Sequence, residues 1–384
     1  MSSVVALACF AVAALVGFLA FECLFGAGRR TVAPPQTDAP FFTVLMPAHD
    51  EAGIIAGPIN AVMAQLRCSD RLVVIADNCS DDTAEIARSL GATVLERSNP
   101  DLRGKGHALE FGRAGLGGIS SEVVIIVDAD CIAEPGALEA IAATCASRGA
   151  VVQGSYGLIA KADASTKVRI SCFAFMIKNL IRQNAVQTLS GFALLQGTGM
   201  AFPRAVFDRI EWRADSLVED LDMGIDLVLA GIPVVFDPSA AFLSDASSEA
   251  ATAGQRRRWE HGFLRSMGRN VPALLRKAFA GRWRLAFMAL DLMIPPTVML
   301  IALASIVLVL GLSVLGLASP VWALLSALAL LAIGLLRAWH VHGRDILPLR
   351  SIAGIPGYMA WKLPIAVQFF TRRESEWTRT ERGQ

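Results

Sequence analysis

Two long runs without a charged residue restrict the fold of this chain more than any other feature of the sequence. Residues 2–21 carry no charge, and residues 292–336 carry none either. A helix of about 20 apolar residues spans the roughly 30 Å hydrocarbon core of a bilayer. We therefore expect residues 1–28 to form an N-terminal transmembrane anchor. Residues 291–337 are expected to form two transmembrane helices, broken around Gly316–Pro320.

The remaining sequence has the character of a folded domain outside the bilayer. Hydrophobic residues make up 54% of the chain, which is high for an ordinary soluble domain, whereas 18% charged residues is high for a chain buried in lipid. Residues 29–40 contain Pro34, Pro35 and Pro40 and predict a stiff linker. A single domain over residues 41–255 follows it.

That domain alternates apolar runs typical of strands with segments of helical periodicity. The expected strands are 42–46, 72–76, 93–96, 123–127, 151–156, 199–202 and 234–236. The expected helices are 56–66, 82–90, 104–112, 135–147 and 219–230. This alternation predicts an α/β fold with a mostly parallel sheet that helices cover on both faces.

Two carboxylates follow the most apolar of these strands. The run Val123–Val127 ends at Asp128-Ala129-Asp130, so both acids emerge at the carboxyl end of a buried strand, where open α/β sheets bind ligands. Asp128 and Asp130 at this spacing suit Mg²⁺ or Mn²⁺ bridging two phosphates. The alternative is an ordinary turn or helix cap.

Other polar clusters also follow strands. Pro47-Ala48-His49-Asp50-Glu51 comes after the first strand, and Asp77 begins a polar run after the second. Acidic groups gathered on one sheet edge repel one another unless a cation or hydrogen-bond donors balance them, which favours a binding site. Alternatively, Asp81 or Asp82 caps the next helix and Glu51 is an exposed loop charge.

The distribution of charge predicts how the chain meets a membrane. The net charge is only +1, so no global attraction to nucleic acid is expected. Residues 256–290 are rich in arginine and tryptophan and predict basic amphipathic helices on anionic membrane lipids. Arginines flanking the apolar runs predict a multi-pass inner-membrane protein whose domain over residues 41–255 lies in the cytoplasm. Residues 338–384 are expected to be cytoplasmic or interfacial.

A series of ordered motifs resembles the family 2 inverting glycosyltransferases of GT-A fold, in particular membrane members similar to polysaccharide synthases and ceramide glucosyltransferase. The motifs are Pro47-Ala48-His49-Asp50-Glu51, Asp77, Arg103-Gly104-Lys105-Gly106, Asp128-Ala129-Asp130, Gln196-Gly197-Thr198-Gly199, Glu219-Asp220 and Gln255-Arg256-Arg257-Arg258-Trp259. The match extends over residues 43–259. Two departures are Val218, where the family commonly has threonine, and the small number of predicted spans.

The resemblance assigns roles to single residues. It implies donor binding by Pro47, His49, Glu51, Asp77, Lys105 and Asp128. It implies a metal held by Asp128 and Asp130, and catalysis by Asp220 as general base with Arg258 at the diphosphate. Acceptor or gating positions would be Gln196, Gly197, Thr198, Glu219, Gln255 and Trp259. The alternatives on the residues alone are a helix-capping acid at Asp220 and a membrane-interface aromatic at Trp259.

The resulting hypothesis is an Mg²⁺- or Mn²⁺-dependent glycosyltransferase of hexosyltransferase type. It would move a sugar from a nucleotide-sugar donor, with a lean to a UDP-sugar, to a lipid-linked saccharide acceptor in exopolysaccharide or glycolipid biosynthesis. One alternative is a processive polysaccharide synthase, although three spans are fewer than channel-forming synthases have. A second is a catalytically silent membrane scaffold that binds nucleotide sugar.

Overall fold

The chain forms two compact units that are each assembled from segments distant in the sequence. The computed structural model describes residues 1–28, 39–212, 216, 218–247 and 249–371, and leaves the side chains of 249–257 and 365–371 outside that description. The helical unit comprises Met1–Arg29, Ala160–Gly191 and Ala246–Gly383, and the sheet unit comprises Arg30–Ile159 and Phe192–Asp245. Most of the predicted linker at 29–40 therefore lies outside the described residues.

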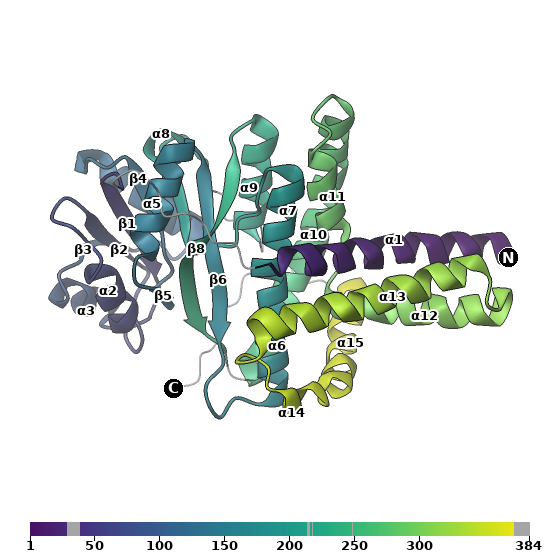
Figure 1. Ribbon diagram of the computed structural model, residues 1–384. Coiled ribbons are helices and arrows are strands. Elements are labelled where there is room, and N and C mark those ends of the chain that lie inside the picture. The colour runs from purple at the N-terminus through teal and green to yellow at the C-terminus, as the bar shows by residue number, and fades with distance from the viewer. Residues whose placement is uncertain (29–38, 213–215, 217, 248, 372–384) are drawn as a thin grey trace. The chain divides into compact units, whose positions relative to one another are not determined.

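An eight-stranded sheet with the order β3-β2-β1-β4-β7-β6-β8-β5 organises the sheet unit (Figure 1). β3, β2, β1 and β4 are parallel, β6 is parallel to β8, and β7 and β5 run antiparallel to their neighbours. The strands are β1 (Phe42–Ala48), β2 (Arg71–Asp77), β3 (Thr93–Arg97), β4 (Val123–Ile126), β5 (Cys131–Ala133), β6 (Val151–Ile159), β7 (Met200–Pro203) and β8 (Val234–Asp245).

Helices cover both faces of this sheet, which is why its central strands read as unbroken apolar runs. Val44 and Met46 of β1 belong to the core that includes α2 and α5, whereas Leu45 points the other way, toward Gly112 of α4. The helices of this unit are α2 (Ala56–Met63), α3 (Thr83–Ser89), α4 (Lys105–Gly115), η1 (Leu116–Gly118), α5 (Ala137–Arg148), α8 (Arg204–Phe207) and α9 (Glu219–Ala230).

The α/β fold with a mostly parallel sheet is confirmed. Every strand and helix expected from the sequence overlaps an observed one, and α9 has the predicted bounds. The sequence did not indicate β5, which is three residues long, or α8. It also gave no sign of the helices in residues 160–191.

The helical unit is built from long helices (Figure 1). They are α1 (Ser2–Gly26), α6 (Thr166–Met176), η2 (Ile177–Arg182), α7 (Gln183–Ser190), α10 (Glu249–Phe279), α11 (Leu285–Met293), α12 (Thr297–Leu315), α13 (Ser319–Ala338), η3 (Trp339–Gly343), α14 (Leu349–Ile352) and α15 (Ile355–Thr371). The basic stretch expected at 256–290 is thus divided between α10 and α11. The apolar piece at 351–370 lies in α14 and α15.

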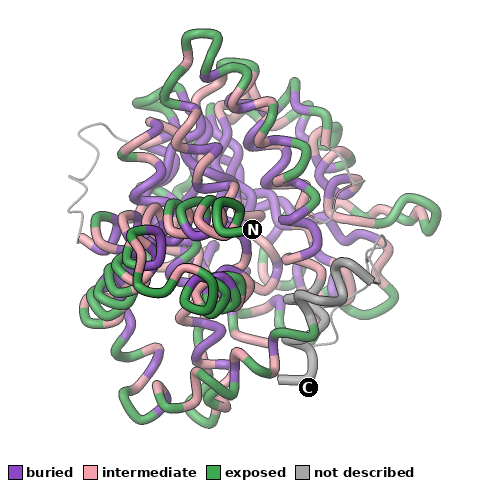
Figure 2. The backbone as a smooth tube through the Cα atoms, turned by 90° about the vertical axis from the view of Figure 1, so that its right-hand side faces the viewer, coloured by how far each residue is buried: buried purple, intermediate pink, exposed green. Residues whose placement is uncertain are grey.

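Three of these helices are long and apolar enough to cross a membrane, namely Ser2–Gly26, Thr297–Leu315 and Ser319–Gly343. They lie side by side and share one hydrophobic cluster. Their outward faces expose large apolar side chains, among them Phe10, Ile306 and Ile333. In Figure 2 exposed positions recur along the helical tubes around the N-terminus. Such faces suit a hydrocarbon environment rather than water.

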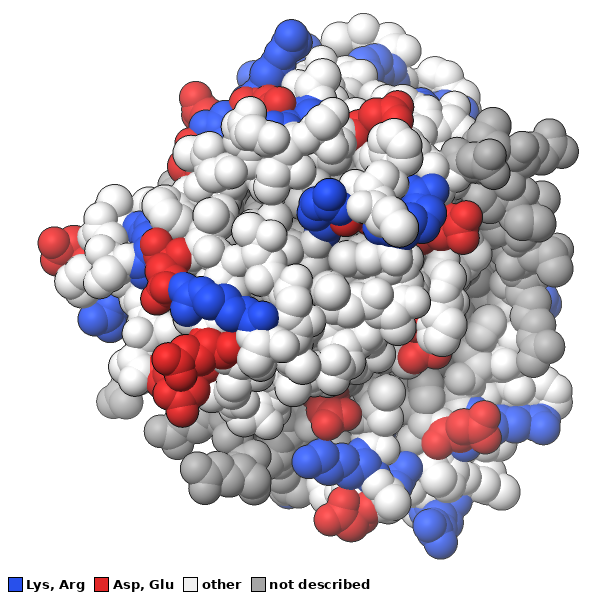
Figure 3. Space-filling model, turned by 90° about the vertical axis from the view of Figure 1, so that its left-hand side faces the viewer, with Lys and Arg blue, Asp and Glu red and all other residues white. Residues whose placement is uncertain are grey.

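On the side of the molecule seen in Figure 3, charged groups form no single-sign field. Small groups of lysine and arginine lie near small groups of aspartate and glutamate, with uncharged surface between them. This mixture accords with the balance of 35 basic and 34 acidic residues in the sequence.

A buried ion triad joins three segments of the helical unit. The Arg182 guanidinium lies 3.2 Å from Glu22 Oε2 and 2.7 Å from Asp291 Oδ1, and it also donates to the Asp291 carbonyl oxygen at 2.8 Å. Glu22 is 0%, Arg182 7% and Asp291 2% exposed. The triad therefore connects α1, η2 and α11 where water cannot replace a missing partner.

Removing the guanidinium should be strongly destabilising. Arg182→Met leaves two buried carboxylates without their cation, and we expect the free energy of unfolding to fall by about 3–5 kcal/mol. Thermal unfolding of the full chain in detergent measures this, with Arg276→Met at an exposed site on α10 as the control. The triple variant Glu22→Gln, Arg182→Met, Asp291→Asn should recover most of the loss. Equal effects of Arg182→Met and Arg276→Met would contradict the role of the triad.

Candidate active site

Parallel pairing brings the polar ends of three strands to one edge of the sheet. His49 follows β1, Asp77 ends β2 and Asp128 lies two residues beyond β4, and these strands are neighbours in the order β2-β1-β4. β2 and β3 are added on one side of β1, whereas β4 is added on its other side, so the order of the strands reverses between β1 and β4. In open α/β sheets this is the point at which ligands bind.

Lys105 connects two of the predicted motifs. It is the first residue of α4, and its ammonium group forms an ion pair with the Asp128 carboxylate. The same Nζ donates to the Gly197 carbonyl oxygen at 2.5 Å. The lysine of the glycine-rich motif therefore holds the first aspartate of the Asp-x-Asp motif against the loop that contains Gln196 and Thr198.

That loop is shaped by a buried glutamine that sequence reasoning missed. Gln153 of β6 is 0% exposed, accepts a hydrogen bond from the Gln196 backbone N–H at 2.8 Å, and donates to the Thr198 carbonyl oxygen at 2.9 Å. The Thr198 hydroxyl accepts from the Asp128 backbone N–H at 3.0 Å. The sequence offered one indication of this role, because Gln153 is the single amide side chain in the strand expected at 151–156.

Asp220 borders the same loop. Gly197 has φ +94°, and a Cβ placed on it would come within 3.2 Å of Asp220 Oδ2 and 4.0 Å of Lys105 Nζ. Only glycine adopts this backbone conformation readily and leaves room for the carboxylate. Asp220 lies in the first turn of α9.

The electrostatics of this cluster favour a cation. The carboxylates of Asp128, Asp220 and Glu219 all interact with the ammonium group of Lys105. Burial and then repulsion from Asp220 raise the pKa of Glu219 from its usual 4.5 to about 7. Burial alone would lower the pKa of Lys105, but attraction to Asp128, and to Asp220 and Glu219, raises it above its usual value. A divalent ion would offset the repulsion from Asp220 that contributes to the raised pKa of Glu219.

The donor set of Asp128 and Asp130 fits a hard metal ion. Both offer carboxylate oxygens, the ligands that Mg²⁺ and Mn²⁺ prefer. Burial raises the pKa of Tyr156 well above its usual value, and the charge of Asp130 is the next largest cause, so Asp130 lies close to Tyr156. The residues present therefore suit the metal that the sequence predicts.

A second acidic group is less suited to a metal. Ligand atoms of Asp50, Cys79 and Asp81 lie within 4.8 Å of one another. Asp50 Oδ1 accepts from the Ser80 backbone N–H at 2.6 Å, and Asp81 Oδ2 accepts from the Ala52 N–H at 3.1 Å. Burial raises the pKa of Cys79, which keeps the thiol protonated. These contacts connect the loops after β1 and β2, so we assign the group to loop structure.

The predicted nucleotide-binding residues border the same sheet edge. His49 Nδ1–H donates to the Asp77 carbonyl oxygen at 2.7 Å, and Asp77 Oδ1 lies 2.5 Å from Arg97 Nη1. The Glu51 backbone N–H donates to the Thr83 hydroxyl at 2.8 Å, and Pro47 lies within β1. The structure gathers these residues, and their roles toward a nucleotide stay predictions.

Three further predicted residues belong to the helical unit. Arg258 and Trp259 lie on α10, and the Trp259 ring packs on Phe175 of α6 with centroids 5.7 Å apart. The side chain of Gln255 lies outside the described residues. Catalytic and gating roles at these positions therefore also stay predictions.

Comparison with known proteins identifies the family. The model of Glycosyltransferase like family 2 matches residues 39–262, and the chain belongs to this family. A curated relative named "Probable glycosyltransferase YdaM", from Bacillus subtilis (strain 168), is 27% identical over 242 residues, which are 59% of this chain and 56% of the relative. The chain thus spans just over half the length of that relative.

One similar solved structure supports the fold. The mannosyltransferase PcManGT from Pyrobaculum calidifontis, in complex with GDP-Man and Mn²⁺, superposes with a TM-score of 0.61 at 18% identity, covering 97% of this chain and 100% of that chain. Glucosyl-3-phosphoglycerate synthase from Mycobacterium tuberculosis, in complex with Mn²⁺, UDP and phosphoglyceric acid, gives 0.40 at 19% identity, covering 59% and 78%. The fold is of the GT-A type, as the sequence predicted.

Glu219 should make the stability of the chain depend on pH. Because its pKa is about 7 in the folded chain and 4.5 in the reference state, the stabilisation from the protonated form is full below pH 4.5 and is lost as the pH rises through 7. At about pH 8 we expect the free energy of unfolding of Glu219→Gln to exceed that of wild type by on the order of 1–3 kcal/mol, seen as a higher unfolding temperature. At about pH 4 the two proteins should unfold at the same temperature. Parallel pH profiles for the two proteins would contradict this. Exposed Glu139→Gln is the control.

Proposed function

We propose that this chain is an inverting glycosyltransferase that moves a sugar from a nucleoside-diphosphate donor to a lipid-linked saccharide at a membrane. The observation that carries the proposal is the cluster in which Lys105 binds Asp128 and the Gly197 carbonyl oxygen beside Asp220. Four motifs, each more than twenty residues from the next, thus bring an ammonium group, two carboxylates and a glycine loop together.

The chemistry follows from these groups. An acceptor hydroxyl attacks the anomeric carbon, forming the new C–O bond as the bond from that carbon to the diphosphate oxygen breaks. Asp220 takes the hydroxyl proton as the bond forms. The bond electrons leave with the nucleoside diphosphate, whose added charge requires nearby positive groups. Lys105 is placed to supply one, and Arg258 is proposed as another because its planar guanidinium matches phosphate oxygens.

A divalent ion completes the proposed site. Mg²⁺ or Mn²⁺ held by Asp128 and Asp130 would neutralise charge on the diphosphate. Lys105, which contacts Asp128, would add a second positive charge beside that ion. The similar mannosyltransferase was solved with Mn²⁺, which supports this part of the proposal.

The donor is proposed as a nucleotide sugar without a fixed base. The sequence leans to UDP, whereas the similar mannosyltransferase holds GDP-Man. Pro47, His49, Glu51 and Asp77 border the sheet edge where a base and ribose would lie. Release of nucleoside diphosphate from a panel of UDP- and GDP-sugars, with membrane extract as acceptor, distinguishes the two.

Membrane attachment supports a lipid-linked acceptor. Besides the three apolar helices, Phe279 is 90% and Trp283 64% exposed, and both lie near Arg276, Lys277 and Arg282 in the sequence. Aromatic and basic side chains together favour the headgroup region of an anionic leaflet. The proposed orientation places the sheet unit in the cytoplasm. Labelling of exposed Cys68 by an impermeant thiol reagent in inverted membrane vesicles tests that orientation.

Two other functions are separable by experiment. A processive polysaccharide synthase would extend a defined acceptor by many sugars, so products carrying a single added sugar exclude it. A silent nucleotide-sugar-binding scaffold would bind donor without turnover. The cluster of Lys105, Asp128 and Asp220 supports catalysis over the scaffold, because binding alone requires no base beside the loop.

Asp220→Asn should abolish transfer while sparing donor binding. The amide cannot accept the acceptor proton, and we expect kcat to fall by about 10²- to 10⁴-fold with the donor Kd within about threefold of wild type. Asp226→Asn, on the same helix, is the matched control and should keep its activity. Turnover by Asp220→Asn at the wild-type rate would remove Asp220 from the mechanism.

Metal removal should distinguish the two acidic groups. Chelation by EDTA should stop release of nucleoside diphosphate, and Mg²⁺ or Mn²⁺ should restore it. We expect Asp130→Asn to raise the metal concentration needed for half-maximal activity about tenfold or more, because one of few protein ligands is lost. Asp81→Asn, in the other acidic group, should leave that concentration unchanged. The reverse pattern would move the metal to Asp50 and Asp81.

A further inference from the structure

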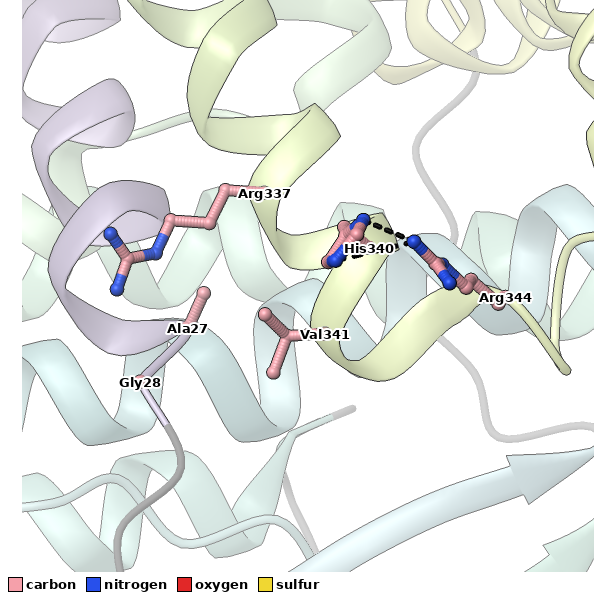
Figure 4. A pocket seen from close by; sticks show the side chains of 6 residues that line it. All are labelled: Ala27, Gly28, Arg337, His340, Val341 and Arg344. Atoms are coloured by element: carbon pink, nitrogen blue, oxygen red, sulfur yellow. Dashed lines mark hydrogen bonds between the residues drawn. The ribbon is translucent and has the colours of Figure 1, made fainter.

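A basic pocket lies at one end of the apolar helices, outside the residues assigned to glycosyl transfer. Its volume is about 470 Å³, and it is lined by Ala27, Gly28, Arg337, His340, Val341 and Arg344. Figure 4 shows Arg337 extending toward the end of α1, with His340 and Arg344 together on the other side. All six residues belong to the helical unit.

The pocket sits where a hydrocarbon layer would end. Arg337 is the first charged residue after the neutral run of 292–336, and Ala27 immediately follows α1. The end of α1 and the end of α13 thus meet at the level of the first basic side chains. In a membrane this level is occupied by lipid phosphates.

The two arginines are available to an anion. Within the described chain no ion pair joins Arg337 or Arg344 to an acidic residue. Arg344 is instead held from two sides. Its Nη2 donates to His340 Nδ1, and its guanidinium carbon lies 5.8 Å from the centre of the Trp339 ring. A guanidinium oriented in advance loses less freedom when it binds a phosphate.

The helix ends do not oppose an anion as strongly as their dipoles suggest. Helix C-termini expose carbonyl oxygens, which repel negative groups. Here the Ala27 carbonyl oxygen accepts a hydrogen bond from His342 Nε2 at 3.1 Å, which satisfies one of them. The net lining is two guanidinium groups and an imidazole around an open space. A volume of about 470 Å³ accommodates a small polar headgroup.

We infer that this pocket binds the phosphate of an anionic phospholipid headgroup, with Arg337 and Arg344 as the ligands and the acyl chains lying along α1 and α13. The bound lipid joins the end of α1 to the end of α13, two helices far apart in the sequence. The inference concerns lipid binding and stands whether or not glycosyl transfer is the function of the chain.

Native mass spectrometry of the full chain in detergent, titrated with phosphatidylglycerol or phosphatidylcholine, measures this binding. We expect the first phosphatidylglycerol to bind at least tenfold more tightly than phosphatidylcholine. Arg337→Gln with Arg344→Gln should weaken the first phosphatidylglycerol about tenfold or more. Arg350→Gln, an exposed arginine on α14 outside the pocket, is the matched control and should change Kd less than twofold.

Two further measurements separate the pocket from general charge. Val341→Trp fills the space without changing charge and should also weaken phosphatidylglycerol about tenfold, and it remains informative if the double arginine variant does not fold. Equal loss in Arg350→Gln, or no loss in Val341→Trp, overturns the inference in favour of diffuse attraction. Displacement of the lipid by millimolar inorganic phosphate also overturns it, because the source would then be free phosphate.

Discussion

The helical unit depends on one buried guanidinium. Arg182 neutralises Glu22 from α1 and Asp291 from α11, so the segments 1–26, 160–191 and 285–293 share one set of charges that cannot be satisfied separately. Beside this contact, α1 comes so close to the backbone of Ile181 that a Cβ on Gly26 would lie 2.0 Å from its carbonyl oxygen. An apolar triad of similar size could be as stable. What the charged version adds is that it specifies which three segments meet.

The edge of the sheet unit also brings like charges together. Parallel pairing gathers carboxylates from separate loops, and repulsion among them would favour a more open arrangement. Lys105 reduces that repulsion by contacting Asp128 while also fixing the Gly197 carbonyl oxygen. Burial, and after it repulsion from Asp220, still raises the pKa of Glu219. The remaining negative charge is what makes a divalent cation part of the proposed site, and Gly197 leaves room for the Asp220 carboxylate.

Much of this was readable from the sequence, for identifiable reasons. Val123–Val127 and its neighbours predicted the parallel strands because burial on both faces leaves a continuous apolar run. The motifs around Lys105, Asp128 and Asp220 predicted which loops converge. The helices in 160–191 left no such signal, since Asn179, Arg182, Gln183 and Asn184 are all buried although polar. The role of Gln153 was not predicted for the same reason. It is a buried polar side chain that forms hydrogen bonds with a loop more than forty residues away in the sequence.

Residues 160–191 belong to the helical unit but lie in the sequence between two segments of the sheet unit, and this affects both synthesis and truncation of the protein. The chain passes between the two units four times, and it leaves the sheet after β6 before β7 has been added between β4 and β6. During translation, the central strand β7 is therefore synthesised only after part of the helical unit. Neither unit is a contiguous stretch of sequence. Trimming the termini cannot yield an independent enzyme core, which would instead require a designed bridge from Ile159 to Phe192.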